Sequence, residues 1–559
     1  MVKKYIGISL VALCLGLTSC DDFLDKLPDN RTEANTEEKI IKLLVSAYPT
    51  HDHMAFTEYA SDNVDDMGAN NPNTERFLDE IYGWIDVTET DNQDPESYWM
   101  DLYQCIETAN MALEGIESMG GATTTKLKEM QAEALMCRAY AHFMLVNVFA
   151  THYNANDPDA LGVSYVTETE KELNPKYERE TVHQNYAHIQ EDLEAALPYV
   201  GDSYYNVPKY HFNRNAAYAF ATRFYLYYEK YDKAIEYANK VLGTNPQTML
   251  RDWAVLNTMP DGTDSQQDPT TYHVIEPTLN CNLLLHTSYS LQGVYFGGFY
   301  TGKRYSHNAY IGTNETIGAL AKLWNPANGS QSDYAYLVKT YSGTNINSWS
   351  QWRMPYLFEI TDPVAGIGFS HTVYAAFTGD EVLLNRAEAY IMQKNYDKAC
   401  EDMTVWLRNV VSANYKTFTL DTARVNKFMK GLAYAYDEEG KANAGINSSL
   451  NKHLHPKFTI DKEGSDQENM IQLVLAMRRY ETLHEGKRWF DIKRWGIEIP
   501  RRVMNGDGVP VKIVDWLVVD DPRRAIQIPQ KVREAGYTPN PRPEKPVGGD
   551  QIVNVIAQD

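Results

Sequence analysis

A short pattern that occurs twice constrains the fold of this chain more than any other feature. Tyr225 is followed six positions later by Tyr231, and Tyr231 is followed directly by Asp-Lys-Ala. The same residue types recur with the same spacing from Tyr390 to Ala399. A small alanine beside a charged turn is typical of two helices that pack closely. Because such a helix pair cannot bury its own apolar face, each pair must stack against a neighbour. The pattern therefore predicts stacked helix pairs.

The first copy resembles a tetratricopeptide helix pair, with an aromatic residue and an aspartate at the turn and Pro246 after the second helix. Apolar residues spaced three and four apart predict further helices. These helices span residues 37–48, 99–116, 127–149, 181–199 and 213–242. The expected fold is mainly α, with tetratricopeptide-like helix pairs forming a superhelical scaffold.

Two stretches interrupt the helical pattern. Residues 251–370 are rich in Gly, Asn, Ser, Thr, Tyr and Trp, which predicts a loop-rich insertion with short helices and few short strands. Residues 59–96 are rich in Asn, Asp and Gly, and we expect a long loop there. Long irregular loops in compact proteins are often functional. A binding site is therefore expected in these two stretches.

Residues 477–496 predict two consecutive helices. Trp489, Ile492 and Trp495 form the apolar stripe of the second helix. Gly486 is expected to cap the first helix and Gly496 to end the second, because glycine adopts the left-handed conformation without strain. The arginines and acids among these aromatic residues are interpreted as buried ion pairs that fix packing, and not as a catalytic site.

Residues 479–481 together with 485–496 resemble the C-terminal signature of the SusD/RagB family. Members are surface lipoproteins of Bacteroidetes that capture nutrients for an outer-membrane transporter. The resemblance implies a single body over residues 37–559. Its expected parts are N-terminal helical repeats (37–250), the loop-rich insertion (251–370), C-terminal helical repeats with the signature helices (371–500) and an irregular tail (501–559).

The N-terminus is expected to be a lipoprotein leader. Two lysines precede an apolar run at residues 6–17, which has the length of a signal-peptide core and is too short to span a bilayer. Leu17–Cys20 resembles a bacterial lipobox, so residues 1–19 are the predicted signal peptide and Cys20 the lipidated residue. Residues 20–36 would form a polar tether. The resemblance implies a surface-exposed protein of the outer membrane, held by its lipid alone.

Composition excludes several classes of function. The formal net charge of −23 argues against nucleic acid as a partner. The chain contains no His-Glu-x-x-His, Gly-x-Gly-x-x-Gly or Walker pattern, so we expect neither a catalytic residue nor a cofactor. Acidic turns at residues 261–268 and 461–466 lack the twelve-residue calcium loop. Solvated turns are favoured over a structural calcium, and no metal site is predicted. The four cysteines outside the leader and the lipobox are expected to be buried thiols.

Candidate binding residues follow from the chemistry of sugars. Aromatic rings stack on the C–H faces of sugars, while carboxylates and amides meet their hydroxyls. Aromatic candidates on irregular segments are Trp84, Tyr295, Tyr300, Tyr305, Trp324, Trp349 and Trp352. Asp62 and Asn63 are expected to supply a polar rim. We expect two or three of these side chains to contact a ligand.

Three functions are compatible with this sequence. The first, which the resemblance favours, is non-catalytic binding of an oligosaccharide or polysaccharide and its delivery to a SusC-like, TonB-dependent transporter. The second keeps the fold but captures peptides, as in the RagB branch of the family. The third is a surface glycosidase, because some pair among 75 acidic residues could adopt the spacing that such an enzyme needs.

Overall fold

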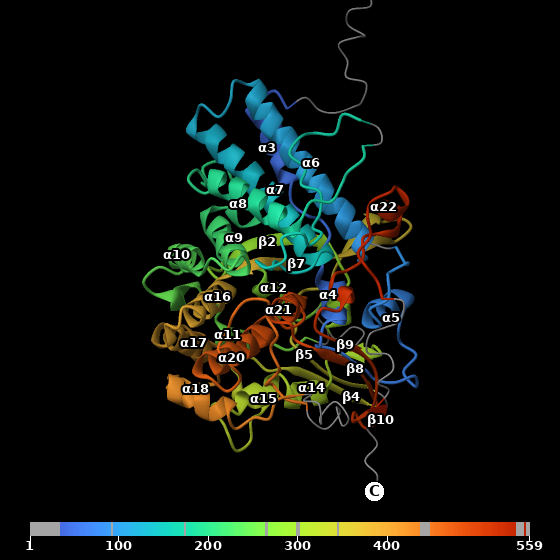
Figure 1. Ribbon diagram of the computed structural model, residues 1–559, viewed down its shortest axis with the longest axis vertical. Helices are drawn as coiled ribbons and strands as arrows, with labels where there is room; N and C mark the ends of the chain where they lie inside the picture. Colours follow the sequence, from blue (N-terminus) through green and yellow to red (C-terminus); the bar gives the residue numbers. More distant parts are fainter. Residues whose placement is uncertain are drawn as a thin grey trace, which may run out of the picture.

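The structure is a computed structural model that describes residues 34–90, 93–172, 175–262, 266–297, 302–343, 346–435, 448–543 and 553–554. The predicted signal peptide, Cys20 and Tyr300 lie outside these residues. The described body is mostly helical, with the N-terminal helices at one end and most short strands toward the other (Figure 1). This arrangement confirms the predicted fold class. No described helix is both long enough and apolar enough to cross a membrane.

The N-terminal helices form the upper part of the body (Figure 1). α6 (Pro95–Ser118) and α7 (Thr125–Phe149) pack along each other, α3 (Glu37–Val45) packs on both, and α8 (Val182–Ala196) packs on α7. Side chains cap the helix starts: Asp94 accepts the backbone N–H groups of Glu96 and Ser97 at 2.7 and 2.9 Å. Each predicted helix in this region is therefore present, with boundaries shifted by a few residues.

The repeated pattern forms two equivalent helix pairs. α9 (Arg214–Tyr227) pairs with α10 (Tyr231–Leu242), and α16 (Gly379–Met392) pairs with α17 (Tyr396–Val410). Glu229 and Lys394 occupy the same place in the two turns, and both have a φ of 59°. α10 packs on α16, so the two pairs stack directly on each other as predicted.

The signature helices are α20 (Asp466–Glu481) and α21 (Arg488–Trp495), and all but the first residue of α20 is buried. Gly496 ends α21 in the left-handed conformation, as predicted. Gly486 does not cap α20, which ends at Glu481. Instead it lies in the turn before α21 with a φ of 70°, and a Cβ there would approach Thr57 Oγ1 to 2.2 Å. Glycine is thus required where α4 (Met54–Ala60) meets this turn.

The insertion contains short helices and strands, as predicted. Its helices are α11 (Trp253–Leu256), α12 (Pro269–Val274), α13 (Gln292–Tyr295), α14 (Ala309–Asn314) and α15 (Ile317–Ala321). Its strands are β2 (Asn282–Tyr289), β3 (Tyr305–Ser306), β4 (Lys339–Gly343), β5 (Ile346–Ser350), β6 (Leu357–Asp362) and β7 (Ile367–Thr378). β2, β7 and β6 form one antiparallel sheet in that order, and β4 pairs with β5.

The prediction of an irregular tail over residues 501–559 is wrong for the first part of this segment. β8 (Ile499–Met504) and β9 (Pro510–Leu517) form an antiparallel pair there. They belong to a sheet of order β10-β9-β8-β1-β3, which includes β1 (Asp65–Asp66) and β10 (Val553–Asn554). The predicted loop at 59–96 is also more regular than expected, because it contains β1 and α5 (Arg76–Tyr82). The remaining helices are α18 (Thr422–Met429) and α22 (Gln530–Glu534).

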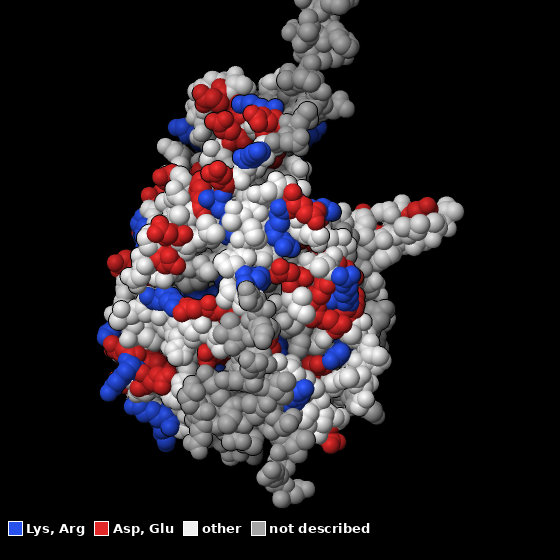
Figure 2. Space-filling model, turned by 45° about the vertical axis from the view of Figure 1, so that its right-hand side comes forward, with Lys and Arg blue, Asp and Glu red and all other residues white. Residues whose placement is uncertain are grey.

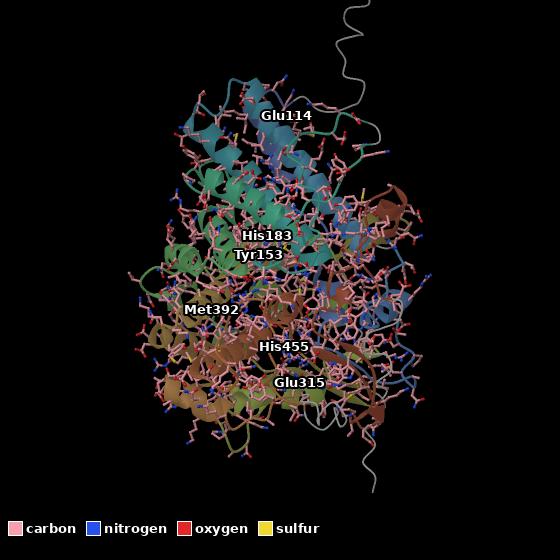
Figure 3. The ribbon with its side chains drawn as sticks, viewed as in Figure 1. Glu114, Tyr153, His183, Glu315, Met392 and His455 are labelled. Atoms are coloured by element: carbon pink, nitrogen blue, oxygen red, sulfur yellow. The ribbon has the colours of Figure 1, made fainter. Side chains whose placement is uncertain are left out.

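Charged side chains of both signs are interspersed over the face shown in Figure 2. The net charge is therefore not gathered into one patch on this face. Figure 3 places Glu114, Tyr153 and His183 among the upper helices, and His455 and Glu315 in the lower half of the body. These positions locate the two regions described next: a buried ionic network around Glu315, and open cavities beside the upper helices.

Candidate functional site

The predicted aromatic platform is not at the surface. Trp84, Tyr295, Tyr305, Trp324 and Trp352 are only 2–7% exposed. Trp349 is half-buried. The expectation that these rings form an exposed cluster is therefore wrong for the described members, which belong to the core.

Specific partners hold these rings inside. Trp84 Nε1 donates to the carbonyl of Ala60 at 2.9 Å, and the guanidinium of Arg501 lies 3.9 Å from the indole centroid. Tyr305 stacks on Tyr82 with ring centroids 4.2 Å apart, and its hydroxyl donates to Asp79 at 2.6 Å. Buried tyrosine and tryptophan normally find such hydrogen-bond partners.

The predicted polar rim is buried as well. The Asp62 carboxylate accepts two hydrogen bonds from Arg488, at 2.8 and 2.9 Å, and lies 3.3 Å from Arg479. Asn63 accepts from Arg479 at 2.9 Å and donates to Glu58 at 3.0 Å. The Ser-Asp-Asn segment after α4 therefore binds the signature helices, and the expectation that Asp62 and Asn63 form an exposed polar rim is wrong.

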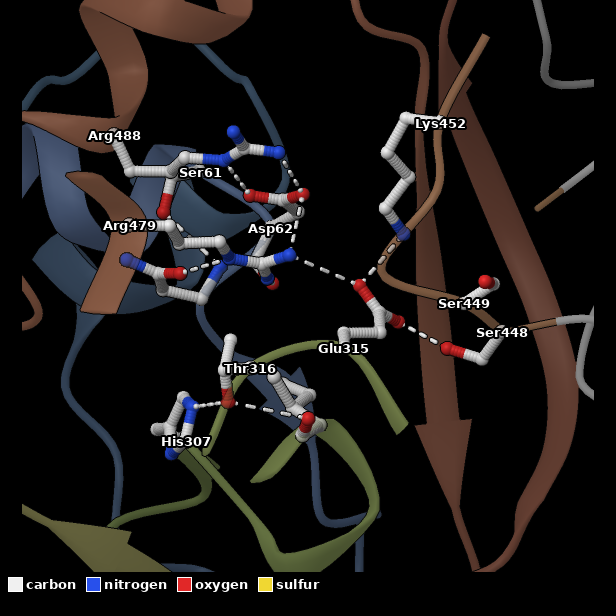
Figure 4. A network of polar contacts seen from close by, with 12 residues as sticks. Ser61, Asp62, His307, Glu315, Thr316, Ser448, Ser449, Lys452, Arg479 and Arg488 are labelled. Atoms are coloured by element: carbon white, nitrogen blue, oxygen red, sulfur yellow. Dashed lines mark hydrogen bonds and ion pairs between the residues drawn. The ribbon is translucent and has the colours of Figure 1, made fainter. Parts of the chain in front are cut away.

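Glu315 is the centre of the same network (Figure 4). Its carboxylate pairs with Arg502 at 2.6 Å, Lys452 at 2.7 Å and Arg479 at 3.3 Å, and accepts a hydrogen bond from Ser448. These partners come from β8, from the segment before α20 and from α20 itself. One insertion residue thus joins three C-terminal segments, which explains why so many charges lie between the signature aromatics.

Electrostatics show that this network is structural. Burial alone would raise the pKa of Asp62, but Arg479 and Arg488 outweigh it and hold that pKa well below its usual value. Burial likewise opposes ionisation of Glu315, yet Lys452 and Arg502 lower its pKa well below normal. Both carboxylates are therefore ionised and fully paired at neutral pH, with no role left as proton donor.

The acidic turns do not form a metal site in the described residues, where no group of three or more His, Cys, Asp or Glu side chains could hold an ion. Asp268 caps α12 by accepting the N–H of Thr270 at 2.8 Å, and Asp461 pairs with Lys394 at 2.8 Å. The four described cysteines are buried free thiols, as predicted.

A groove of about 560 Å³ is lined by several aromatic side chains. It lies between α6, residues 164–170 and 175–177, and the segment around α22. Its aromatic wall consists of Trp99, Tyr103, Tyr177 and Tyr537. Its polar wall includes Gln104, Glu107 and Glu170. We call this cavity the tyrosine groove.

The wall of the tyrosine groove is preformed. Trp99 lies 5.1 Å from Tyr103 and 5.6 Å from Tyr537, measured between ring centroids. The hydroxyl of Tyr103 donates to the carbonyl of Ser164 at 3.1 Å. Tyr177 is the open ring of the set: it is 43% exposed. Its hydroxyl donates to the carboxylate of Glu170.

The sequence contained one signal for this groove that we missed. Tyr177 is a lone tyrosine in a charged stretch that also contains Pro175, between two predicted helices. An aromatic residue in such a polar connection has no apolar face to join, so it is expected at the surface. Tyr103, in contrast, is one of many aromatic residues spaced along a helix, and the sequence does not show that it borders a cavity.

Comparison with known proteins gives the family. Residues 22–226 match the profile described as starch-binding associating with outer membrane, and residues 259–540 match the SusD family profile. No curated protein matches the sequence.

Solved structures share the fold at low sequence identity. A SusD superfamily protein from Bacteroides thetaiotaomicron has a TM-score of 0.57 and 16% identity, over 90% of this chain and 98% of its own. A putative sugar binding protein from Bacteroides vulgatus has a TM-score of 0.58 and 16% identity, over 91% and 99%. A laminarin binding SusD-like protein has a TM-score of 0.51 and 15% identity, over 91% and 99%.

These likenesses agree with the mainly helical fold. The SusD family profile spans half of the chain, and the first of these solved structures shares its fold over 90% of the chain. The chain belongs to the SusD family.

Proposed function

We propose that this protein binds a glycan at the cell surface without catalysis and delivers it to a SusC-like, TonB-dependent transporter in the outer membrane. The profile matched by residues 22–226 is described by starch binding, and a SusD-like protein of similar fold binds laminarin. Both support a glycan as the class of ligand. The lipid on Cys20 would keep the protein and its ligand next to the transporter, where high effective concentration makes modest affinity sufficient.

The composition of the tyrosine groove is the observation that carries this proposal. Tyr103 and Tyr177 offer ring faces for sugar C–H groups, and the carboxylates of Glu107 and Glu170 lie among them as hydroxyl acceptors. The volume of about 560 Å³ falls in the range of small-molecule sites. A peptide could also occupy an aromatic groove, so peptide capture remains the competing function.

Calorimetric titration of the purified full chain in detergent with a glycan panel that includes laminarin tests the proposal. We expect heat and saturation with at least one glycan. The absence of heat from every glycan, together with peptides found by mass spectrometry of co-purified ligand, would favour peptide capture. Sugar product released during the titration would favour the glycosidase.

Delivery needs a separate experiment in cells. A strain that lacks this chain but retains the transporter should take up the bound glycan more slowly, and expression of the chain should restore uptake. Expression of a Cys20→Ala variant should restore it poorly, because the unlipidated protein is not held at the membrane. Equal uptake with and without the chain would contradict delivery.

A further inference from the structure

A second open cavity, of about 520 Å³, is distinct from the tyrosine groove. It lies where residues 151–161, after α7, meet His455, the end of α21 and residues 519–525. Figure 3 shows His455 in the lower half of the body, below Tyr153 and His183. We call this cavity the junction cavity.

Two buried cations line the junction cavity. Lys493 is 9% exposed and Arg524 is 7% exposed. Nζ of Lys493 donates to the carbonyls of Asn147 and Ala150, at 2.5 and 2.6 Å, at the end of α7. Within the described part of the chain, the Arg524 guanidinium donates only to backbone carbonyls, those of Val518, Ile492, Ile497 and Leu517.

Neither cation has a carboxylate partner among the described residues. Other buried cations of this protein do, as Lys452 shows by pairing with Glu315 at 2.7 Å. Three acids line the junction cavity: Asp520 pairs with Lys457 at 2.5 Å, Asp521 pairs with Arg523 at 2.7 Å, and Asp157 is exposed.

Both cations keep hydrogen-bonding capacity. Two of the three N–H groups of Lys493 are used by described residues, and four of the five of Arg524. Buried charges are normally compensated by an opposite charge, because desolvation is costly. Burial, and then the nearby charge of Arg524, lowers the pKa of Lys493 to about 7. The cavity therefore has two neighbouring basic groups. Among the described residues neither has a carboxylate in direct contact, and Asp521, Glu498 and Asp520 act on Arg524 only at longer range.

We infer that the junction cavity binds an anionic substituent of a sugar, a carboxylate or a sulfate, on Lys493 and Arg524. Charge-assisted hydrogen bonds from an ammonium and a guanidinium are the strong contacts that such groups form. A neutral sugar hydroxyl would supply no direct charged partner to Lys493 or Arg524, whereas an anionic substituent would, so we expect the cavity to favour acidic over neutral glycans.

The junction cavity and the tyrosine groove lie close together in the fold. Leu161 and Asn540 line the junction cavity, whereas Ser164 and Tyr537 line the tyrosine groove. The members of each pair are three positions apart in the chain, and three extended residues span at most about 10 Å. The inference rests on the proposed function for its ligand class: a glycan whose neutral part occupies the groove and whose acidic residue occupies the junction cavity.

The test compares three probes on the purified full chain in detergent: an oligosaccharide that contains glucuronate, the neutral oligosaccharide of the same length and linkage, and free glucuronate. Calorimetry should show at least tenfold tighter binding of the acidic than of the neutral oligosaccharide, and this preference should weaken as salt is added. Free glucuronate should bind weakly and compete with the acidic oligosaccharide only.

Lys493→Met should abolish the preference and leave the affinity for the neutral oligosaccharide unchanged, which also shows that the variant is folded. Lys457→Met is the matched control, because Lys457 lines the same cavity but is exposed and paired with Asp520. It should keep most of the preference. If Lys493→Met does not fold, Arg524→Lys serves as the second variant. It keeps the positive charge but loses the planar guanidinium, so it should reduce the preference for the acidic oligosaccharide.

The outcomes separate this inference from the proposed function. Equal affinity for the acidic and neutral oligosaccharides in the wild type, or an undiminished preference in Lys493→Met, would overturn the anion site and leave glycan binding intact. Binding of free glucuronate, with no binding of the neutral oligosaccharide, would support the anion site and count against the tyrosine groove.

Discussion

Asp62→Asn distinguishes a structural role for the segment after α4 from a ligand-binding one. In the wild type the carboxylate accepts from Arg488 at 2.8 and 2.9 Å and is 5% exposed. Asparagine keeps one acceptor but loses the negative charge, and it points an amide donor at a guanidinium that also donates. Arg488 would then be a buried cation without its carboxylate.

The magnitude follows from this geometry. Removing one partner of a buried ion pair costs about 3–5 kcal/mol of unfolding free energy. Arg479 retains Glu315 at 3.3 Å, so only Arg488 loses its partner. We therefore expect the lower end of the range, about 3 kcal/mol. Glu236→Gln is the control, since Glu236 forms an exposed pair with Lys240 on α10 and should cost only about 0.3–0.5 kcal/mol.

Chemical denaturation at neutral pH measures both variants. The pKa of Asp62 is lower in the folded state, so its contribution is present above the unfolded pKa of about 3.9 and is lost as pH falls below that value. The difference between wild type and Asp62→Asn should therefore shrink in acid. An Asp62→Asn protein as stable as wild type, with impaired glycan binding, would refute the structural role and return Asp62 to a ligand site.

Three further variants test the packing. Gly486→Ala should lower the unfolding free energy by at least about 2 kcal/mol, because it combines a left-handed φ with a clash against Thr57. Gly120→Ala also has a positive φ but open space around its Cβ, and should cost about 1 kcal/mol. Equal melting temperatures of the two variants would contradict this. Trp352→Ala should lower the unfolding free energy by about 3–5 kcal/mol and leave the glycan affinity unchanged, because the ring is buried. A variant with wild-type stability and lost glycan affinity would place the ring in a ligand site. The pKa of Lys493 falls from 10.5 to about 7 in the fold, so the unfolded chain binds more protons between these pH values. Denaturation at about pH 7 and about pH 9 should therefore show the unfolding free energy of the wild type rising relative to that of Lys493→Met. The same difference between the two proteins at both pH values would contradict this.

The helical part of the fold could be predicted because its information is local. The repeated pattern fixes a turn, and Glu229 and Lys394 adopt the same φ in the two copies. The charges of the signature helices were also interpreted correctly, since arginines and acids placed among Trp489, Phe490 and Trp495 have no low-cost alternative to pairing.

The binding site could not be predicted because burial depends on contacts distant in sequence. Asp62 and Arg488 pair across 426 positions. Arg501 and Ala60 enclose Trp84 from opposite ends of the chain. An irregular stretch rich in Trp and Tyr looks the same in sequence whether its rings face solvent or a second core.

Titration of Tyr177→Ala with the glycan that the panel identifies tests most directly whether capture takes place in the tyrosine groove. Tyr272→Ala is the matched control, because Tyr272 is also exposed, at 41%, but lies on α12 outside the groove. Loss of one stacking ring is worth about 1.4 kcal/mol, so Tyr177→Ala should bind about tenfold more weakly, while Tyr272→Ala stays within about twofold of wild type. Unchanged affinity in Tyr177→Ala would contradict the groove as the capture site.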